Sequence, residues 1–255
     1  MNAFMKPRAL VLRSPGTNCD YETGFALRRA GFESDAVHVN ALIRGERSLE
    51  EFDLLVLPGG FSYGDYISSG KILANKLSHR LKGAIPGFVD SGGVVLGICN
   101  GFQTLVKSGL LPGFGGDYSK QLATLALNDS GHFQDQWVTM QNVSRGKCPL
   151  VKGVKSIYTP INHGEGRFVP RDKNVLDRLY DEDQVVFKYI DNPNGSVDGI
   201  AGICDSTGRI LGFMPHPEKN VLSINDPRST RVDLPPDGEG FAFFRALFSF
   251  VKKKR

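Results

Sequence analysis

Cysteine is scarce in this chain, and its four cysteines stand far apart, at Cys19, Cys99, Cys148 and Cys204. No Cys-x-x-Cys pair is present, so the sequence does not point to a thiolate metal centre or a dithiol redox site. Scattered cysteines also do not make the dense disulfide framework of small secreted domains. We therefore expect free thiols, a cytoplasmic location, and no metal ion bound to this chain.

Long apolar runs are missing as well. No segment approaches the roughly 20 apolar residues that span a bilayer, and residues 1–8 lack the apolar centre of a signal peptide. The net charge of +4 is small, and its clearest local source is the tail at 252–255. Such a tail is more typical of a solvated helix end than of a nucleic-acid site. The sequence thus predicts binding to neither membranes nor nucleic acids.

The first half of the chain alternates strand-like and helix-like segments. Apolar runs and helical periodicity predict strands at 9–12, 36–39, 53–57 and 94–98, and helices at 21–30, at 70–82 and directly after Cys99. This rhythm predicts an α/β fold with a central, mostly parallel sheet and helices on both faces. Because ligands of such sheets bind at the carboxyl ends of the strands, loops 14–19 and 58–65 should meet the bend at Cys99.

The second half is richer in strands, which we expect at 137–143, 156–160, 185–190, 199–204 and 209–213. Turn-forming residues at 194–195 and 206–208 separate the last three, so a smaller antiparallel section should lie beside the parallel sheet. A length of 255 residues and a hydrophobic content of 40% are ordinary for one α/β unit. We expect residues 1–255 to form a single domain.

Cys99 follows the apolar run 94–98 within the pattern Gly97-x-Cys99-x-Gly101. A buried strand that turns sharply into a helix exposes the residue at the bend, and flanking glycines let the two backbones approach closely. The helix N-terminus favours the thiolate, and the N–H of Asn100 points to where an oxyanion would form. A lone cysteine after an apolar strand is more often a core residue, but these glycines favour a nucleophile elbow.

A second polar pair, His216 and Glu218, follows a late strand. Met214 and His216 each precede a proline, which disfavours helix at the preceding residue. We therefore expect extended backbone, in which residues two apart project to the same side. A carboxylate bound to one ring nitrogen leaves the other free to face a thiol. His-x-Glu alone is commonly a solvated surface pair, but together with Cys99 it favours a Cys–His–Glu triad that breaks a carbonyl bond.

Longer motifs carry a family resemblance. Residues 58–66, 97–103 and 214–218 resemble the class I (triad) glutamine amidotransferases, which have a flavodoxin-like fold. More narrowly, the motifs at 16–20, 61–66 and 162–168 resemble the stand-alone glutaminase subunits of phosphoribosylformylglycinamidine synthase. The resemblance extends from about residue 8 to residue 218. The chain departs from the family pattern at Gln136, where we expect arginine before the tryptophan.

The resemblance implies a role for each residue of the triad. Cys99 would attack the side-chain amide carbon of L-glutamine to give a γ-glutamyl thioester, and water would then release glutamate. His216 would pass a proton to the departing ammonia and activate the water, while Glu218 would orient the imidazole. The oxyanion hole would consist of two backbone N–H groups, that of Asn100 and that of Gly60 in the loop 58–60.

For the amino-acid end of glutamine, the resemblance implies contacts from Gln103, Asn162 and Gly164. Gln103 lies about one helical turn beyond Cys99, on the same helix face. The simpler alternatives are a surface glutamine at 103 and a plain loop turn at 162–164. Arg167 is left open between a charge clamp, a structural contact and a partner contact.

No phosphate-binding loop is evident. The nearest candidate, from Gly64 to Gly70-Lys71-Ile72, has the wrong glycine spacing and lacks the Ser or Thr after the lysine that would hold magnesium. The resemblance implies no cofactor on this chain. ATP and Mg²⁺ would bind to a separate PurL-type synthetase subunit, which converts formylglycinamide ribonucleotide (FGAR) to formylglycinamidine ribonucleotide (FGAM) in de novo purine biosynthesis. A PurS-type bridging subunit would complete the complex, and this chain would supply its ammonia.

Other functions compete with this hypothesis. A PfpI-type peptidase or deglycase has a similar sheet, but those proteins typically place histidine directly after the elbow cysteine, where this chain has Asn100. A non-catalytic partner-binding module would not need an intact triad. Two segments are left open: the phenylalanine-rich helix expected at 241–251 belongs either to the core or to a partner interface, and 220–240 matches no pattern.

Overall fold

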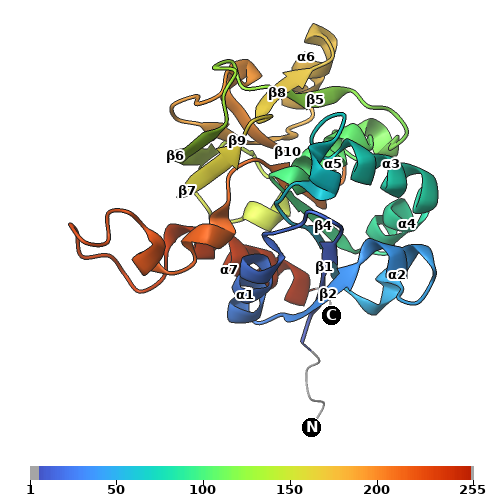
Figure 1. The fold of residues 1–255 in the computed structure, drawn as a ribbon, viewed down its shortest axis with the longest axis horizontal. Coiled ribbons are helices and arrows are strands. Elements are labelled where there is room, and N and C mark those ends of the chain that lie inside the picture. The colour runs from blue at the N-terminus through green and yellow to red at the C-terminus, as the bar shows by residue number, and fades with distance from the viewer. Residues whose placement is uncertain (1–5, 254–255) are drawn as a thin grey trace.

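A nine-stranded sheet runs through the part of the chain that the computed structural model describes, residues 6–253. Its strands lie in the order β2-β1-β3-β4-β11-β10-β9-β6-β7 (Figure 1). Lys254 and Arg255 of the basic tail lie outside the described residues. All four cysteines are free and buried.

One half of this sheet is parallel. It consists of β1 (Arg8–Arg13), β2 (Glu33–His38), β3 (Leu54–Leu57), β4 (Val94–Ile98) and β11 (Ile210–Phe213). The strands β3, β4 and β11 are apolar and buried along their whole length, as expected for strands that helices cover on both faces. The first three predicted strands are confirmed with shifts of a few residues, the largest at β2, where Val39 already begins a helix.

The other half is antiparallel and contains β10 (Ile200–Cys204), β9 (Val185–Tyr189), β6 (Gln134–Asn142) and β7 (Ser156–His163). The predicted meander of the last three strands is confirmed, because β10 pairs antiparallel with both β9 and β11. A separate two-stranded sheet of β5 (Ala123–Ala126) and β8 (Arg167–Pro170) was not expected. Arg167 thus lies in a strand.

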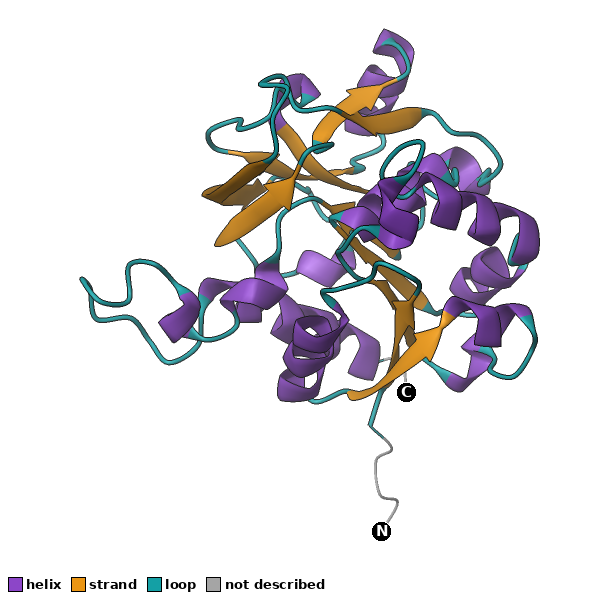
Figure 2. Ribbon diagram, in the orientation of Figure 1, coloured by secondary structure: helices purple, strands orange, loops and turns teal. Residues whose placement is uncertain are grey.

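Helices cover both faces of the parallel half (Figure 2). On one face α1 packs against α7, and on the other α3 packs against α5 (Figure 1). The α/β fold class is confirmed, whereas α2, α4 and α6 were not expected. The helices are α1 (Asp20–Ala30), α2 (Val39–Ile43), α3 (Lys71–Arg80), α4 (Ala84–Asp90), α5 (Asn100–Lys107), α6 (Lys173–Asp181) and α7 (Glu239–Lys252), with 3-10 turns η1 (Leu49–Glu51), η2 (Ser62–Asp65), η3 (Phe114–Gly116), η4 (Pro149–Val151), η5 (Val197–Gly199), η6 (Pro217–Asn220) and η7 (Ser223–Asn225).

The phenylalanine-rich helix α7 belongs to the core. Phe243 and Phe244 are fully buried, and the Phe243 ring meets Phe213 of β11 edge to face at a centroid distance of 5.2 Å. The segment before α7, which matched no pattern, leaves the sheet as an arm at the left of Figure 1. An antiparallel bridge between Leu222 and Asp237 closes the base of this arm.

Candidate active site

The turn from β4 into α5 has the geometry of a nucleophile elbow. Cys99 stands between them with φ 50° and ψ −106°, a strained conformation for a residue with a side chain. Its N–H donates to the carbonyl of Phe213 on the neighbouring strand at 2.9 Å. A Cβ on Gly97 would lie 2.8 Å from the Gly101 backbone, and a Cβ on Gly101 would lie 1.9 Å from Leu57 O. Both glycines are therefore required by close backbone approach, as the sequence predicted.

His216 and Glu218 meet just beyond β11. The Nδ1 atom of His216 lies 2.6 Å from Oε1 of Glu218, and both side chains are buried. The contact is the expected one, but the expected backbone is wrong: residues 217–220 form the 3-10 turn η6 rather than an extended segment. Because Pro217 is tolerated in the first turn of a helix, the chain turns directly after His216 and still presents the carboxylate to the ring.

The parallel register of β4 and β11 brings the cysteine to this pair. Phe213 pairs with Ile98, so the residues that follow both strands emerge at the same edge of the sheet. Burial by itself lowers the pKa of His216, but the charge of Glu218 and the neighbouring Cys99 thiol raise it, and the net direction is well upward. A raised pKa keeps the imidazolium form near neutral pH, which is the partner that a thiolate requires.

The predicted oxyanion loop is held in place by the first loop of the chain. Gly60 has φ +143°, and a Cβ there would lie 2.8 Å from both Asn18 N and Gly16 O. The next N–H, that of Phe61, donates to Gly16 O at 2.8 Å, and the N–H of Ser62 donates to the side chain of Asn100 at 3.2 Å. The three loops expected at this edge of the sheet therefore do meet, and only glycine fits at position 60.

The side chain of Gln103 is already engaged by the protein. Its Nε2 donates to the backbone carbonyl of Glu165 at 2.6 Å, and its Oε1 accepts from Asn100 Nδ2 at 3.0 Å. The same Asn100 amide donates to Asp65 at 3.0 Å. Gln103 thus links the helix that follows Cys99 to the segment that contains Asn162 and Gly164.

Asn162 turns its backbone, rather than its side chain, toward the cysteine. Its carbonyl oxygen lies 3.7 Å from Cys99 Sγ. Its side chain donates to Asp135 at 2.5 Å and accepts from Lys219 at 2.8 Å. A Cβ added to Gly164 would meet only one ring carbon of Phe133, at 3.9 Å. This face of the segment is therefore open.

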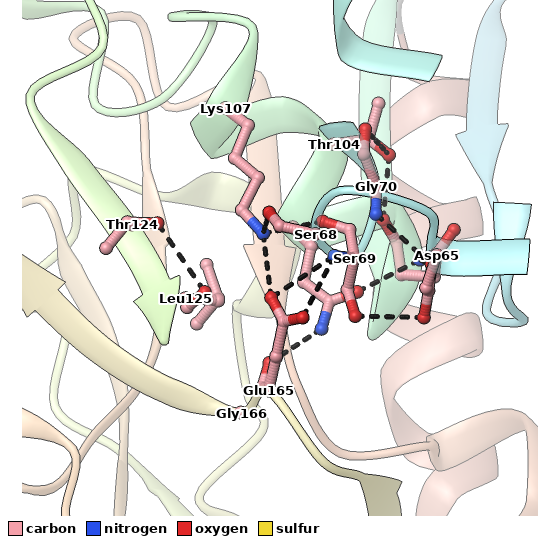
Figure 3. A network of polar contacts seen from close by, with 12 residues as sticks. Asp65, Ser68, Ser69, Gly70, Thr104, Lys107, Thr124, Leu125, Glu165 and Gly166 are labelled. Atoms are coloured by element: carbon pink, nitrogen blue, oxygen red, sulfur yellow. Dashed lines mark hydrogen bonds and ion pairs between the residues drawn. The ribbon is translucent and has the colours of Figure 1, made fainter. Parts of the chain in front are cut away.

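A buried ion pair supports the same segment and was not predicted. In Figure 3, Lys107 reaches from α5 to Glu165, with Nζ 3.0 Å from Oε2. Lys107 also donates to Ser68 Oγ and Ser69 O, each at 2.7 Å, and Ser69 N donates to the Glu165 carboxylate. Burial lowers the pKa of Lys107, and Glu165 opposes this shift. The lysine lies one turn beyond Gln103 on a helix whose residues are all buried. Its partner stands 58 residues away in the chain, so no local sequence signal predicts the pair.

His163, beside Asn162, is an uncharged neighbour of His216. Its ring is buried, and its Nδ1 lies 3.0 Å from Asn128 Oδ1. Burial, followed by the charge of His216, lowers its pKa to about 4. The ring is therefore neutral near pH 7, which avoids a second positive charge next to His216.

Cys19 lies in a loop expected at this edge of the sheet, but sequence reasoning gave it no role at the site. It directly precedes α1, its side chain is buried, and its N–H donates to Gly59 O at 3.2 Å. Its sulfur, one ring nitrogen of His216 and one oxygen of Glu218 all lie within 4.8 Å of one another. Burial raises the pKa of the Cys19 thiol, and the contact with His216 opposes that shift. His216 thus has a thiol neighbour besides Cys99.

The comparisons with known proteins agree with this geometry. The family model for the CobB/CobQ-like glutamine amidotransferase domain matches residues 6–251. A glutamine amidotransferase from Thermotoga maritima shares the fold, with a TM-score of 0.59 at 18% identity over 98% of this chain and 99% of the other. The chain therefore belongs to the glutamine amidotransferases, as the motif resemblance predicted.

More similar relatives define the particular family. The phosphoribosylformylglycinamidine synthase subunit PurQ of Dehalococcoides mccartyi is 41% identical over 97% of this chain and 99% of its own length. The PurQ subunit of Methanococcus maripaludis is 40% identical over 88% of this chain and 87% of its own length. A chain in the structure of PurLQS from Thermotoga maritima matches with a TM-score of 0.77 and 32% identity, over 96% of this chain and 99% of that one. The protein belongs to the PurQ family, the glutaminase subunits of the purine-biosynthetic FGAM synthase.

No helix among residues 6–253 is both long enough and apolar enough to cross a membrane.

Proposed function

We propose that the chain hydrolyses L-glutamine with Cys99, His216 and Glu218 as a catalytic triad. The observation that carries this proposal is the cysteine at the strained elbow, one strand away from a buried His–Glu pair 2.6 Å apart. The Cys99 thiolate attacks the amide carbon, and the His216 imidazolium gives its proton to the leaving nitrogen, which departs as ammonia. His216 then takes a proton from water, whose oxygen attacks the thioester and releases glutamate. Glu218 holds the ring and stabilises its charged form.

The N–H groups of Asn100 and Gly60 are our proposed oxyanion hole. Asn100 is the first residue of α5, where an N–H has no partner within its own helix. The Gly60 peptide can point its N–H into the site because glycine alone tolerates φ +143° there. Donors fixed in this way would stabilise the negative charge of the tetrahedral intermediates.

We propose that the segment 162–164 binds the amino-acid end of glutamine through its backbone. The Asn162 carbonyl already faces Cys99, and the region around Gly164 is open. Gln103, predicted to touch the substrate directly, has both ends of its amide engaged. We assign it the role of fixing this segment, with direct contact to glutamine as a further prediction.

The partners follow from the family. The Thermotoga maritima structure carries the name PurLQS, and we propose that this chain, working in the cytoplasm as one domain over residues 1–255, joins a PurL-type synthetase and a PurS-type bridging subunit. ATP and Mg²⁺ would bind to the synthetase, and no cofactor would bind here. Because free ammonia is mostly protonated near neutral pH, its delivery requires a passage shielded from water.

Reconstitution with both partner subunits tests the proposal. FGAM synthesis is measured with glutamine or with ammonium as the nitrogen source, for the wild type and for Cys99→Ala. We expect the variant to lose only the synthesis that depends on glutamine. Glutamine-dependent FGAM synthesis by Cys99→Ala would refute Cys99 as the nucleophile. If the wild type with folded partners supported no glutamine-dependent FGAM synthesis, FGAR would be refuted as the acceptor of the ammonia.

A further inference from the structure

Cys19, His216 and Glu218 form a buried group whose side chains could together bind a metal ion. Its three ligand atoms, a thiol sulfur, a ring nitrogen and a carboxylate oxygen, lie within 4.8 Å of one another, and it is the one such group found among residues 6–253. The three residues are 4%, 2% and 3% exposed. The proposed hydrolysis uses the histidine and the glutamate, and it gives Cys19 no part.

Two atoms of this group lack hydrogen-bond partners. Nε2 of His216 and Oε2 of Glu218 are buried, and neither makes a hydrogen bond within the described residues. A buried carboxylate oxygen without a partner is costly, and such a group often marks the position of an ion. The Nε2 of His216 faces the thiols and serves the proposed proton transfer, whereas the unpartnered Oε2 of Glu218 has no part in it and points to a positively charged ligand.

The donor set identifies the class of ligand. One thiolate, one imidazole and one carboxylate are ligands that Zn²⁺ accepts, and softer sulfur ligands select against Mg²⁺ and Ca²⁺. Metal–ligand bonds of about 2.0–2.3 Å in a tetrahedron set the ligand atoms roughly 3.3–3.7 Å apart. The ligand atoms lie within 4.8 Å of one another, and the hydrogen-bonded His216–Glu218 pair is only 2.6 Å apart. Shifts of about 1 Å, which bring Cys19 closer and move the pair apart, would therefore give the distances of a zinc site.

Gly59 keeps this space clear of side-chain atoms. A Cβ at position 59 would come within 2.6 Å of Cε1 of His216 and 3.1 Å of the Cys19 sulfur. The thiol and the imidazole therefore face each other across a glycine.

We propose that Cys19, His216 and Glu218 form an inhibitory site for a thiophilic divalent cation, with Zn²⁺ as the expected ion. The Cys19 thiol and the His216 imidazolium each give up a proton to solvent, and the resulting thiolate and neutral imidazole bind the ion together with the Glu218 carboxylate and a water in the fourth position. The bound ion withdraws His216 from proton transfer and so stops glutamine hydrolysis. The inhibitory consequence rests on the proposed function, whereas the binding site does not.

Binding is tested first with Co²⁺, because a thiolate bound to Co²⁺ gives a charge-transfer absorption that reports a sulfur ligand directly. Wild type and Cys99→Ala are expected to show this band, and Cys19→Ser is expected to lose it. Competition with a chromophoric chelator then measures the Zn²⁺ affinity of each variant. We expect Cys19→Ser to bind Zn²⁺ at least about tenfold more weakly than the wild type. Loss of a residue that only hydrogen-bonds to a metal ligand already costs about tenfold or more, and loss of a ligand itself should cost at least as much.

Cys148→Ser is the matched control, since Cys148 is another buried free cysteine and lies outside the site. It should keep both the absorption band and the affinity of the wild type. A band that is lost in Cys99→Ala but kept in Cys19→Ser would overturn the proposal, because the ion would then use the nucleophile. No cobalt band in the folded wild type would overturn it as well.

Inhibition is measured last, as the Zn²⁺ concentration that halves glutamine hydrolysis relative to the metal-free rate of the same variant. Cys19→Ser is expected to need at least about ten times more Zn²⁺ than the wild type, in line with its weaker binding. An unchanged half-inhibiting concentration would contradict the proposal. If the chain had no glutaminase activity, the proposed function would fail while the binding results still decided the metal site.

Discussion

Lys107 Nζ lies 3.0 Å from the Glu165 carboxylate, and the lysine side chain is only 4% exposed. This buried pair joins α5, the helix that follows Cys99, to the segment that faces Cys99. A charge held in such a place is costly when its partner is removed, and the loss of one member of a buried pair commonly costs about 3–5 kcal/mol. We therefore expect the pair to affect both the stability of the fold and the position of the segment 162–164.

Lys107→Met should destabilise the protein by about 2–4 kcal/mol, because Glu165 is itself partly solvated. It should also raise KM for glutamine, since Glu165 is freed to move. Urea unfolding and steady-state kinetics measure the two effects. Lys173→Met removes an exposed ion pair with Asp177 and should change stability by less than about 1 kcal/mol. Equal effects of the two variants would show that the buried pair has no special role.

Gly60→Ala should lower kcat for glutamine hydrolysis by about a hundredfold or more, because the added Cβ displaces the peptide of the proposed oxyanion hole. Gly45→Ala is the control for backbone strain alone. Gly45 also has positive φ, +71°, and no atom lies within 4 Å of the position of its Cβ. It should lose about 1 kcal/mol of stability and keep its kcat. A Gly60→Ala enzyme with unchanged kcat would remove position 60 from the mechanism.

Glu218→Gln should lower the upper pH limit of activity. The carboxylate is the largest influence that raises the pKa of His216, so its removal lets the imidazolium lose its proton at a lower pH. The profile of kcat/KM against pH should shift toward acid, and kcat should fall by about 10²–10⁴-fold because the ring also loses its orientation. A profile with an unchanged alkaline limb would show that His216 does not set it.

Stability should fall in acid because of His163. Its folded pKa of about 4 lies below the ordinary value of 6.5, so the unfolded chain binds the proton more readily. Stability from the neutral ring is present above pH 6.5 and is lost as the pH falls toward 4, by roughly 2 kcal/mol at pH 5. Urea unfolding at pH 7 and pH 5 should show a smaller loss for His163→Gln than for the wild type. The exposed His38→Gln should leave the loss unchanged.

Sequence reasoning predicted the elements whose signals are local. The strand 94–98 is a continuous apolar run, and the helix after Cys99 begins at a glycine pattern that only a tight strand-to-helix turn explains. The strands β5 and β8 escaped notice because they are four residues long and pair only with each other. The short helices α2 and α4 have too few turns for a periodic pattern to appear.

The sequence by itself determined the class of this protein, because an elbow cysteine, a His-x-Glu pair and the motifs around them are local chemical patterns that the chain carries in any conformation. Only the tertiary structure decided that Cys19 lies beside His216, that Lys107 pairs with Glu165, and that Gln103 has its amide engaged. These contacts join residues far apart in the chain. They depend on the strand order and register of the sheet, which the packing of the whole molecule sets and no local pattern encodes.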